Sequence, residues 1–409
     1  MTWGQQDVRP GQHRPEAASQ RVSWLELFFD LLFVTAFDQL AQRYGKQLSL
    51  PGFGIFALMF VAVWWAWLGN TSFAARYGNV GRPYRWGTLL QIVATAMLAL
   101  AIQGDLKDVG WLFAAAYAAG RVALILIYAW HGRQNGMPEG ERRLVGGFVV
   151  STLLWVLSAP LHGAAQWGLW IGALLLDLVV SLYVESRYQR EQPHQEHYPE
   201  RVGTLIIISL GSAITNLVIS AGHQQLRFSD QLPMLLALVC TLALWRMYFD
   251  EANGLPARLA AQRGHRSTLL SWTYAHLPLT LALTVLAVGL GLDIRSGDRY
   301  SALQAQVVIS SSLASVFLSL VLVRVLAAQP LRHEPGLVRT PLHFSLSSVA
   351  RLVGAGLLLG LLALHLPALP YMLGVTGLTL AVAVASWRDP VRQNLTELEE
   401  QLDPGLPPG

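Results

Sequence analysis

Apolar stretches of about twenty residues recur along this chain, separated by short polar connections. A helix of about that length crosses the hydrocarbon of a bilayer, where every backbone polar group must be bonded within the protein. The sequence therefore predicts an all-α, polytopic membrane helix bundle with about twelve transmembrane helices. The predicted spans lie near 24–42, 53–74, 86–103, 110–131, 144–162, 167–185, 202–222, 232–249, 270–292, 302–326, 343–365 and 368–387.

Composition separates this chain from soluble proteins. Hydrophobic residues make up 53% of its 409 residues and charged residues only 13%, whereas a soluble domain carries about 25% charged residues. The single cysteine, Cys240, excludes an internal disulfide and a cysteine-based metal cluster. Lysine and arginine form small groups and no long run, so we expect a lipid bilayer and no nucleic acid as partner. No P-loop, dinucleotide fingerprint or nucleophile motif appears, and we expect no cofactor.

The small basic groups mark alternate connections between the spans. Arg82 and Arg85 follow the second span, and Arg142 and Arg143 follow the fourth. The intervening connections hold few basic residues. Because cytoplasmic loops of membrane proteins are enriched in Lys and Arg, this alternation favours twelve spans with both termini in the cytoplasm.

The twelve spans divide into two sets of six that correspond weakly in sequence. Glu26 begins the first span and Glu200-Arg201 the seventh, while Trp64-Trp65-Ala66-Trp67 in the second span corresponds to Leu244-Trp245-Arg246-Met247-Tyr248 in the eighth. An even number of spans gives both sets the same orientation, so we predict two parallel six-helix repeats. The predicted regions are a cytoplasmic amino tail (1–22), a first half (23–190), a second half (191–390) and a cytoplasmic acidic tail (391–409).

Three carboxylates interrupt the first span. At about 100° per residue, Glu26 and Asp30 lie about 40° apart on one helical face, and Asp38 falls about 80° from Asp30. A carboxylate in the bilayer costs at least about 2.5–3.5 kcal/mol, so each needs a partner, a water-filled cavity or a functional use. Arg121 and Arg246, in the fourth and eighth spans, are the candidate counter-charges. The cluster is either a substrate, ion or proton site or a set of structural ion pairs.

A second polar pattern lies in the seventh span. Ser209, Ser212, Asn216 and Ser220 are spaced three or four residues apart and therefore share one helical face. Such a stripe can line a hydrophilic path, or it can form hydrogen bonds between helices, as small polar residues often do in membranes.

The start of the seventh span places a histidine and a glutamate three residues apart. This spacing of His197 and Glu200 can present two ligands to one metal ion. No second pair of this kind accompanies them, and a glutamate at a helix start is stabilised by the helix dipole. We therefore expect no metal site.

Four segments carry a resemblance to a known family. The segment Ser23-Trp24-Leu25-Glu26-Leu27-Phe28-Phe29-Asp30-Leu31 is similar to the first-span signature of the bacterial low temperature requirement protein A (LtrA) family. The other matching segments follow in the same order and are 64–71, which includes Asn70, 197–203 running into Leu210-Gly211, and 274–279. The resemblance covers nearly the whole chain and implies a multi-pass protein of the bacterial inner (plasma) membrane. The family is named for a growth phenotype in the cold.

The chain departs from the family pattern at two acidic positions. The family usually continues Leu-Gly-Glu in the seventh span, where this chain has Ser212, and often has Asn-Arg-Phe-Asp after the second span, where it has Gly78 in place of the acid. A looser resemblance connects the first span, with its aromatic-aromatic-Asp sequence, to endosomal potassium channels that carry a Phe-Ser-Asp motif and a duplicated six-span unit. That resemblance keeps a channel among the functions considered.

We expect an ion- or proton-coupled transporter, acting on a small solute or ion at a site between the two halves, with Glu26 and Asp30 as its ionisable pair near the bilayer midplane. An ion channel or pore lined by the same helices is the first alternative. The second is a membrane-embedded enzyme acting on a lipid or polyprenyl substrate. Its candidate polar residues are His197, Glu200, Arg201 and Asp250. The sequence leaves open the identity of the substrate and whether the protein forms a homodimer.

These interpretations define one set of candidate residues for binding a substrate or an ion. No catalytic residue and no metal ligand is assigned. The candidates are Glu26, Asp30, Asp38, Asn70, Arg121, His197, Glu200, Arg201, Ser212, Asn216 and Arg246.

Overall fold

The computed structural model describes residues 22–188, 193–194, 196–222, 228–250, 266–295, 302–328 and 345–390. The predicted acidic tail and all of the predicted amino tail except Val22 lie outside these ranges. Within them the chain forms twelve α-helices, one short 3₁₀ helix and no strand. The helices are α1 (Trp24–Lys46), α2 (Leu50–Tyr77), α3 (Arg82–Gln103), α4 (Leu106–Asn135), α5 (Glu139–Ser158), α6 (Gly163–Arg187), α7 (His197–Gly222), α8 (Phe228–Phe249), α10 (Arg266–Arg295), α11 (Ala302–Ala328), α12 (Leu346–Leu361), η3 (Leu362–Leu364) and α13 (Ala368–Trp387).

Local sequence signals fix where the first helices begin and end. Ser23 and Glu26 form a capping box at the start of α1: the Glu26 backbone N–H donates to Ser23 Oγ, and the Ser23 backbone N–H donates to Glu26 Oε2. Asp105 caps α4 by accepting from the Lys107 backbone N–H. Gly78 and Gly136 end α2 and α4 with positive φ angles of 91° and 82°, which glycine adopts without steric cost.

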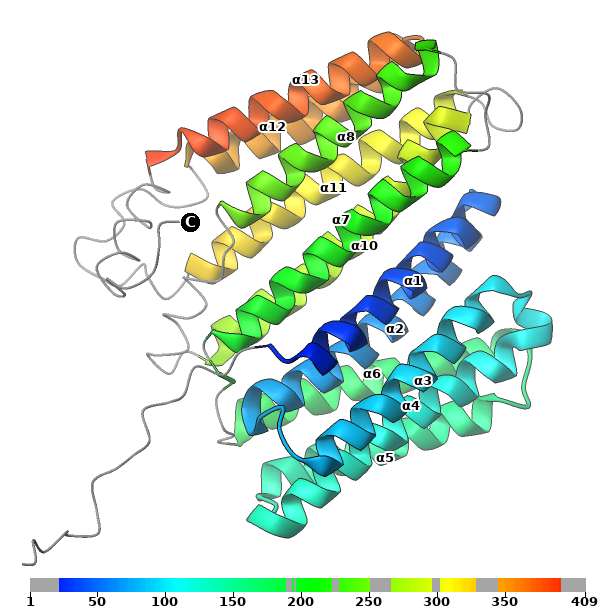
Figure 1. Cartoon of the computed structure of the whole chain (residues 1–409), viewed down its shortest axis with the longest axis vertical. Helices are drawn as coiled ribbons and strands as arrows, with labels where there is room; N and C mark the ends of the chain where they lie inside the picture. Colours follow the sequence, from blue (N-terminus) through cyan, green and yellow to red (C-terminus); the bar gives the residue numbers. More distant parts are fainter. Residues whose placement is uncertain are drawn as a thin grey trace, which may run out of the picture.

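The helices lie roughly parallel and antiparallel to one another in a single bundle (Figure 1). Helices α1–α6 form a first set, and helices α7, α8 and α10–α13 form a second set. In the first set α1 packs on α3, α3 on α4, α4 on α5 and α5 on α6; in the second set α7 packs on α10, α10 on α11, α11 on α12 and α12 on α13. Helix α1 lies between the two sets and also packs against α7 and α10. It therefore lies at the contact between the sets, with one face buried there and another face, which includes Phe28 and Leu31, exposed.

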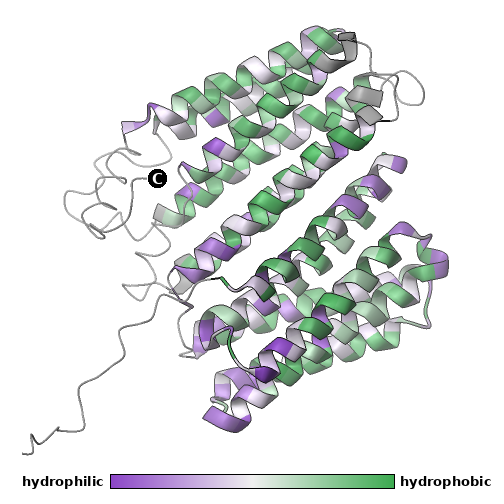
Figure 2. Ribbon diagram, in the orientation of Figure 1, coloured by the Kyte–Doolittle hydropathy of each residue, from purple (hydrophilic) through white to green (hydrophobic). Residues whose placement is uncertain are grey.

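Ten of the twelve described helices are long and apolar enough to cross a membrane. Hydrophobic residues follow the middle of the helices and hydrophilic residues gather near their ends (Figure 2). The two exceptions, α1 and α5, carry more charge. The three carboxylates of α1 are buried against neighbouring helices, whereas the charges of α5 gather between Glu139 and Arg143 at its start. The prediction of an all-α polytopic membrane bundle is confirmed.

Aromatic side chains fill the contact between the two sets. The rings of Trp64 and Trp65 on α2 lie 6.1 and 5.7 Å from the ring of Tyr274 on α10. Trp64 and Trp67 are fully buried, and so is Phe33 on the neighbouring α1. Such rings bury large apolar areas and pack in a few preferred geometries, so the polar groups embedded among them are shielded from solvent.

Candidate functional site

Four ionisable side chains meet where α1 contacts α7. Arg201 places Nη1 2.9 Å from Glu26 Oε1 and Nη2 2.7 Å from Asp30 Oδ1. His197 Nε2 lies 3.1 Å from the same Glu26 Oε1. None of the four residues is more than 1% exposed. The two acids are four residues apart on α1 and the two bases four residues apart on α7, so each helix presents its pair on a single face. We call these four residues the ion network.

Glu26 is held by more than its ionic partners. Its Oε2 atom accepts hydrogen bonds from the Ser23 backbone N–H at 2.8 Å, from Ser23 Oγ at 2.9 Å and from Asn79 Nδ2 at 2.7 Å. The other oxygen, Oε1, faces His197 and Arg201. The carboxylate therefore connects the start of α1 to α7 and to the segment that follows α2.

Helix α2 supplies the remaining contacts of the ion network. Trp67 Nε1 donates to Asp30 Oδ1 at 2.9 Å, and Arg201 Nη2 donates to Thr71 Oγ1 at 3.2 Å. Both α2 residues are buried and, being four residues apart, lie on one face. Three helices thus fix the position of the Arg201 guanidinium relative to Asp30.

The charges of the ion network do not balance when the imidazole is neutral. Two carboxylates, of Glu26 and Asp30, then face the single guanidinium of Arg201, which leaves one net negative charge. An uncompensated charge in a low-dielectric site is costly. Binding of one proton or one monovalent cation makes the cluster neutral. Among the described residues, Asp30 Oδ2, His197 Nδ1 and Arg201 Nε have no hydrogen-bond partner, so the cluster has capacity for a further ligand.

The ion network lies near one end of the bundle, which corrects the expectation of a midplane site. His197 is the first residue of α7 and Glu26 the third of α1, while Thr71 lies in the last two turns of α2. At 1.5 Å per residue, Glu26 and Asp30 fall within about 10 Å of the start of α1. A polar group costs less free energy near a helix end than at the bilayer centre, because water and lipid headgroups are closer.

The predicted counter-charges also need correction. Arg121 on α4 pairs with Asp177 on α6, with an Nη2–Oδ1 distance of 2.7 Å. Arg246 pairs with Asp250 across one helical turn at 3.1 Å, and its side chain is 55% exposed. Neither arginine serves the acids of α1. The counter-charge is Arg201, which sequence reasoning placed among the candidates without assigning it this partner. The signal was the shared four-residue spacing of the acids and of the two bases.

A second polar contact joins α1 and α7 further along the same helices. Asn216 Nδ2 donates to Asp38 Oδ1 at 2.6 Å, and Gln42 Nε2 donates to Asp38 Oδ2 at 2.8 Å. Ser209 donates to the carbonyl of its own helix, at Leu205. Ser212 is fully buried, and its Oγ has no hydrogen-bond partner among the described residues. Of the polar face of α7, Asn216 makes the hydrogen bond to α1.

The remaining candidates lie apart from the ion network. Asn70 points to α3, where its Nδ2 donates to Gln91 Oε1 at 2.8 Å and its Oδ1 accepts from Tyr84 Oη at 3.3 Å. Glu200 is exposed, on a different side of α7 from its neighbour Arg201. In the described part of the chain, no three His, Cys, Asp or Glu side chains are grouped to hold a metal ion.

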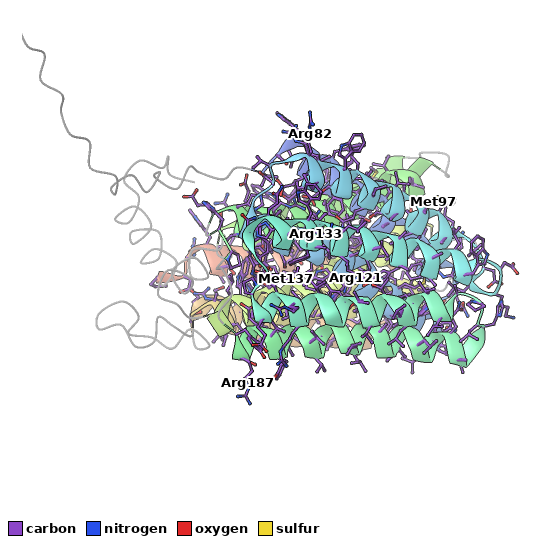
Figure 3. All side chains as sticks on the ribbon, turned by 90° about the horizontal axis from the view of Figure 1, so that it is seen from below. Arg82, Met97, Arg121, Arg133, Met137 and Arg187 are labelled. Atoms are coloured by element: carbon purple, nitrogen blue, oxygen red, sulfur yellow. The ribbon has the colours of Figure 1, made fainter. Side chains whose placement is uncertain are left out.

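A cavity lies on the other side of α2 from the ion network. Its volume is about 70 Å³, and residues of α2, α4, α5, α6, α7 and α10 line it. Two guanidinium groups, of Arg76 and Arg121, and one carboxylate, of Glu185, are part of the lining. Arg121 lies within the bundle, whereas Arg82 and Arg187 project outward from it (Figure 3). The cavity is thus a charged space between the first set of helices and two helices of the second.

Comparison with known proteins gives the family. The profile of the family described as bacterial low temperature requirement A protein (LtrA) matches residues 21–386, which include the ion network and the cavity. One similar protein is the uncharacterized protein RA0937 of Rhizobium meliloti (strain 1021), which is 28% identical over 284 residues, 66% of this chain and 68% of that protein. No solved structure matches the chain. The resemblance expected from the first-span signature is confirmed: the chain is an integral membrane protein that belongs to the LtrA family.

Proposed function

We propose that this protein is an ion- or proton-coupled transporter of the bacterial inner membrane, with two parallel six-helix halves that move relative to each other. The observation that carries the proposal is the ion network, which lies at the contact between the two sets of helices and holds two carboxylates against one guanidinium. A proton or cation bound there changes the strength of the contact between the halves. Binding and movement are coupled in this way in transporters with ionisable residues at a repeat interface.

The coupling step follows from the geometry of Asp30 and Arg201. While Asp30 is ionised, its Oδ1 holds Arg201 Nη2 at 2.7 Å, and separating the two charges inside the protein costs about 3–5 kcal/mol. A proton on Asp30 removes that attraction but leaves Glu26 to neutralise Arg201. The halves then separate at this end at lower cost. Return of the proton to solution restores the closed contact.

The similar packing order in the two sets supports the division into halves. Each set begins with a helix at the contact between the sets, α1 or α7, that packs on the third helix of its set, and the later helices pack in the same sequence. Arg76, Arg82 and Arg187 lie at or near the helix ends next to the ion network. By the positive-inside rule this end faces the cytoplasm, so protons or ions reach the network from that side, and both termini are cytoplasmic.

The test is ion flux in liposomes that contain the purified full chain, under imposed H⁺, Na⁺ and K⁺ gradients. We expect the wild type to carry flux and Asp30→Asn to abolish it. Asp38→Asn is the matched control, because Asp38 is a buried carboxylate on the same helix that bonds to Asn216 and not to Arg201. Size-exclusion profiles show whether each variant is folded.

Two results would overturn the proposal. Absence of flux from the folded wild type under every gradient excludes an ion-coupled transporter. Equal losses in Asp30→Asn and Asp38→Asn exclude the ion network as the coupling site. Flux that saturates with solute concentration distinguishes a transporter from a channel, through which flux rises without saturation over a wide range.

A further inference from the structure

Arg121 is a buried cation with hydrogen-bonding capacity that the protein leaves unused. Its side chain is 2% exposed, and only Nη2 has a partner, Asp177 Oδ1 at 2.7 Å. Among the described residues, Nε and Nη1 have no hydrogen-bond partner. A guanidinium has five N–H donors, and a buried charged donor without an acceptor is unfavourable. The unused donors therefore indicate an acceptor that the protein itself does not supply.

The surroundings hold this guanidinium at the cavity. The Phe148 ring lies 4.1 Å from the Arg121 guanidinium carbon and fixes the plane of the group. Gly69 faces it from α2: a Cβ at this position would lie 3.7 Å from Arg121 Nη1 and 2.6 Å from Leu124 Cδ2. The absence of a side chain at Gly69 keeps this approach to Nη1 clear. Arg121, Phe148 and Gly69 all line the cavity.

The rest of the lining favours an anion. Arg76 adds a second guanidinium, which pairs with Glu185 at 3.2 Å, and both of these side chains are about nine-tenths buried. Ser72, Ser181 and Tyr198 add hydroxyl groups to the lining. The cavity of about 70 Å³ is several times the space that a single water needs. Its size and its donors suit a small group with several acceptor oxygens.

We propose that this cavity binds a phosphate-sized oxyanion, with Arg121 as the main donor and Arg76 as the second. Phosphate is matched to the planar donors of arginine, which bind two of its oxygens at once. The oxyanion is either free phosphate or the headgroup of a phosphomonoester lipid. The inference concerns binding alone and does not depend on the proposed transport activity, which uses residues on the opposite side of α2.

The first test measures equilibrium binding of inorganic phosphate to the full chain in detergent, by calorimetry. Asp177→Asn keeps Arg121 and its hydrogen bond but removes the competing negative charge, so we expect binding to become about tenfold tighter, a change of about 1.4 kcal/mol. The double variant R121Q/D177N replaces the ion pair by a neutral amide pair of similar size, and we expect it to lose binding. The matched control is R324Q/D389N. It makes the same change in another buried ion pair, between Arg324 of α11 and Asp389, which follows α13, and it should bind phosphate like the wild type.

A second arm separates the two sources of phosphate. Dihexanoyl phosphatidic acid carries a phosphomonoester headgroup on a short lipid. Competition between inorganic phosphate and this lipid at an Arg121-dependent site indicates a site for free phosphate as well as for the headgroup. Arg121-dependent binding of the lipid alone indicates a lipid headgroup site.

The proposal fails if neither ligand binds to the wild type or to Asp177→Asn. It also fails if R121Q/D177N binds as tightly as Asp177→Asn. Circular dichroism and size-exclusion chromatography check that the double variant is folded, and the expected gain in Asp177→Asn does not depend on that variant. Binding and ion flux are separate readouts, so failure of one proposal leaves the other to stand on its own.

Discussion

The ion network between the two sets of helices differs from the buried ion pairs inside each set. Arg201 faces two carboxylates, Glu26 and Asp30, which belong to the other set. Arg121 faces the single carboxylate of Asp177 within the first set, and within the second set Arg324 Nη2 lies 2.8 Å from Asp389 Oδ2. The pair of Arg121 and Asp177 matches one cation to one anion, whereas the contact between the sets has an excess of negative charge when the His197 imidazole is neutral.

This difference separates two uses of buried charge. A matched pair is neutral while both of its groups are ionised, and the pair of Arg121 and Asp177 joins two helices of one set. With a neutral imidazole at His197, the mismatched network requires a proton or a cation to become neutral, and it lies where helices of different sets meet. Position and charge balance together, more than burial, distinguish a group suited to coupling from a group suited to stability.

The largest expected effect is that of Arg201→Ala. Among the described residues, the change removes the one guanidinium that faces Glu26 and Asp30. Breaking one buried ion pair typically costs about 3–5 kcal/mol. We expect Arg201→Ala to lower the free energy of unfolding by more than that. Thermal unfolding in detergent, followed by tryptophan fluorescence, measures the loss. The triple variant E26Q/D30N/R201A should recover part of it. A stability equal to that of Arg121→Ala would show that the second carboxylate adds nothing.

The next largest effect is expected for Arg121→Ala, which leaves one buried carboxylate without its cation, whereas Arg201→Ala leaves two. Asp177 is fully buried and Arg121 is its ionic partner. We expect a loss of about 3–5 kcal/mol, and addition of Asp177→Asn should restore most of it. The same unfolding measurement applies. If Asp177→Asn gave no recovery, the loss would come from the missing contact with Phe148 and not from the stranded charge.

A smaller effect is expected for Trp67→Phe. The substitution keeps a buried aromatic ring but removes the Nε1 donor to Asp30 Oδ1. Loss of a hydrogen bond to a charged group costs about 1.5–3 kcal/mol. Trp155→Phe, also a buried tryptophan, is the control for the change in ring size. Equal losses for the two variants would mean that the bond to Asp30 contributes little.

The smallest effect is expected at the surface pair of α5. Arg143 Nη2 lies 2.6 Å from Glu139 Oε1, but the two side chains are 50% and 61% exposed. Solvent screening leaves such pairs with little net contribution. Arg143→Gln should leave the unfolding midpoint unchanged within error. A shift comparable to that of Trp67→Phe would contradict the ranking by burial.

Each of the twelve described α-helices corresponds to one predicted span, and ten of them are long and apolar enough to cross a membrane. The predicted start of the seventh helix was less accurate. The predicted seventh span began at residue 202, whereas α7 begins at His197 and so includes both bases of the ion network. Hydropathy places a boundary at the first run of apolar residues, but polar residues near a helix start can be helical and buried where another helix supplies their partners. Arg201, the fifth residue of α7, is such a residue, and Glu26 and Asp30 of α1 are its partners.

The sequence also did not identify which arginine pairs with which buried acid. Arg121, Arg201 and Arg246 are equivalent in a hydropathy plot, and each is a plausible partner for a buried acid. The packing of α7 against α1, and the ion pair of Arg121 and Asp177 that joins α4 to α6, decide between them. Helix neighbours are long-range contacts that hydrophobic periodicity does not encode. The four-residue spacing of His197 and Arg201 matches that of Glu26 and Asp30, but the sequence interpretation did not use this signal and named Arg121 and Arg246 instead.

The capping box at the start of α1 gives Glu26 two functions in one carboxylate. One oxygen accepts the Ser23 backbone N–H and keeps the first turn of α1 wound, while the other faces Arg201 on the opposite set. The first turn of α1 and the contact between the sets are therefore joined through one side chain, and we expect a change at Glu26 to weaken both. Hydrogen exchange at the start of α1 would then follow the state of an interface whose ionic contacts lie on other residues.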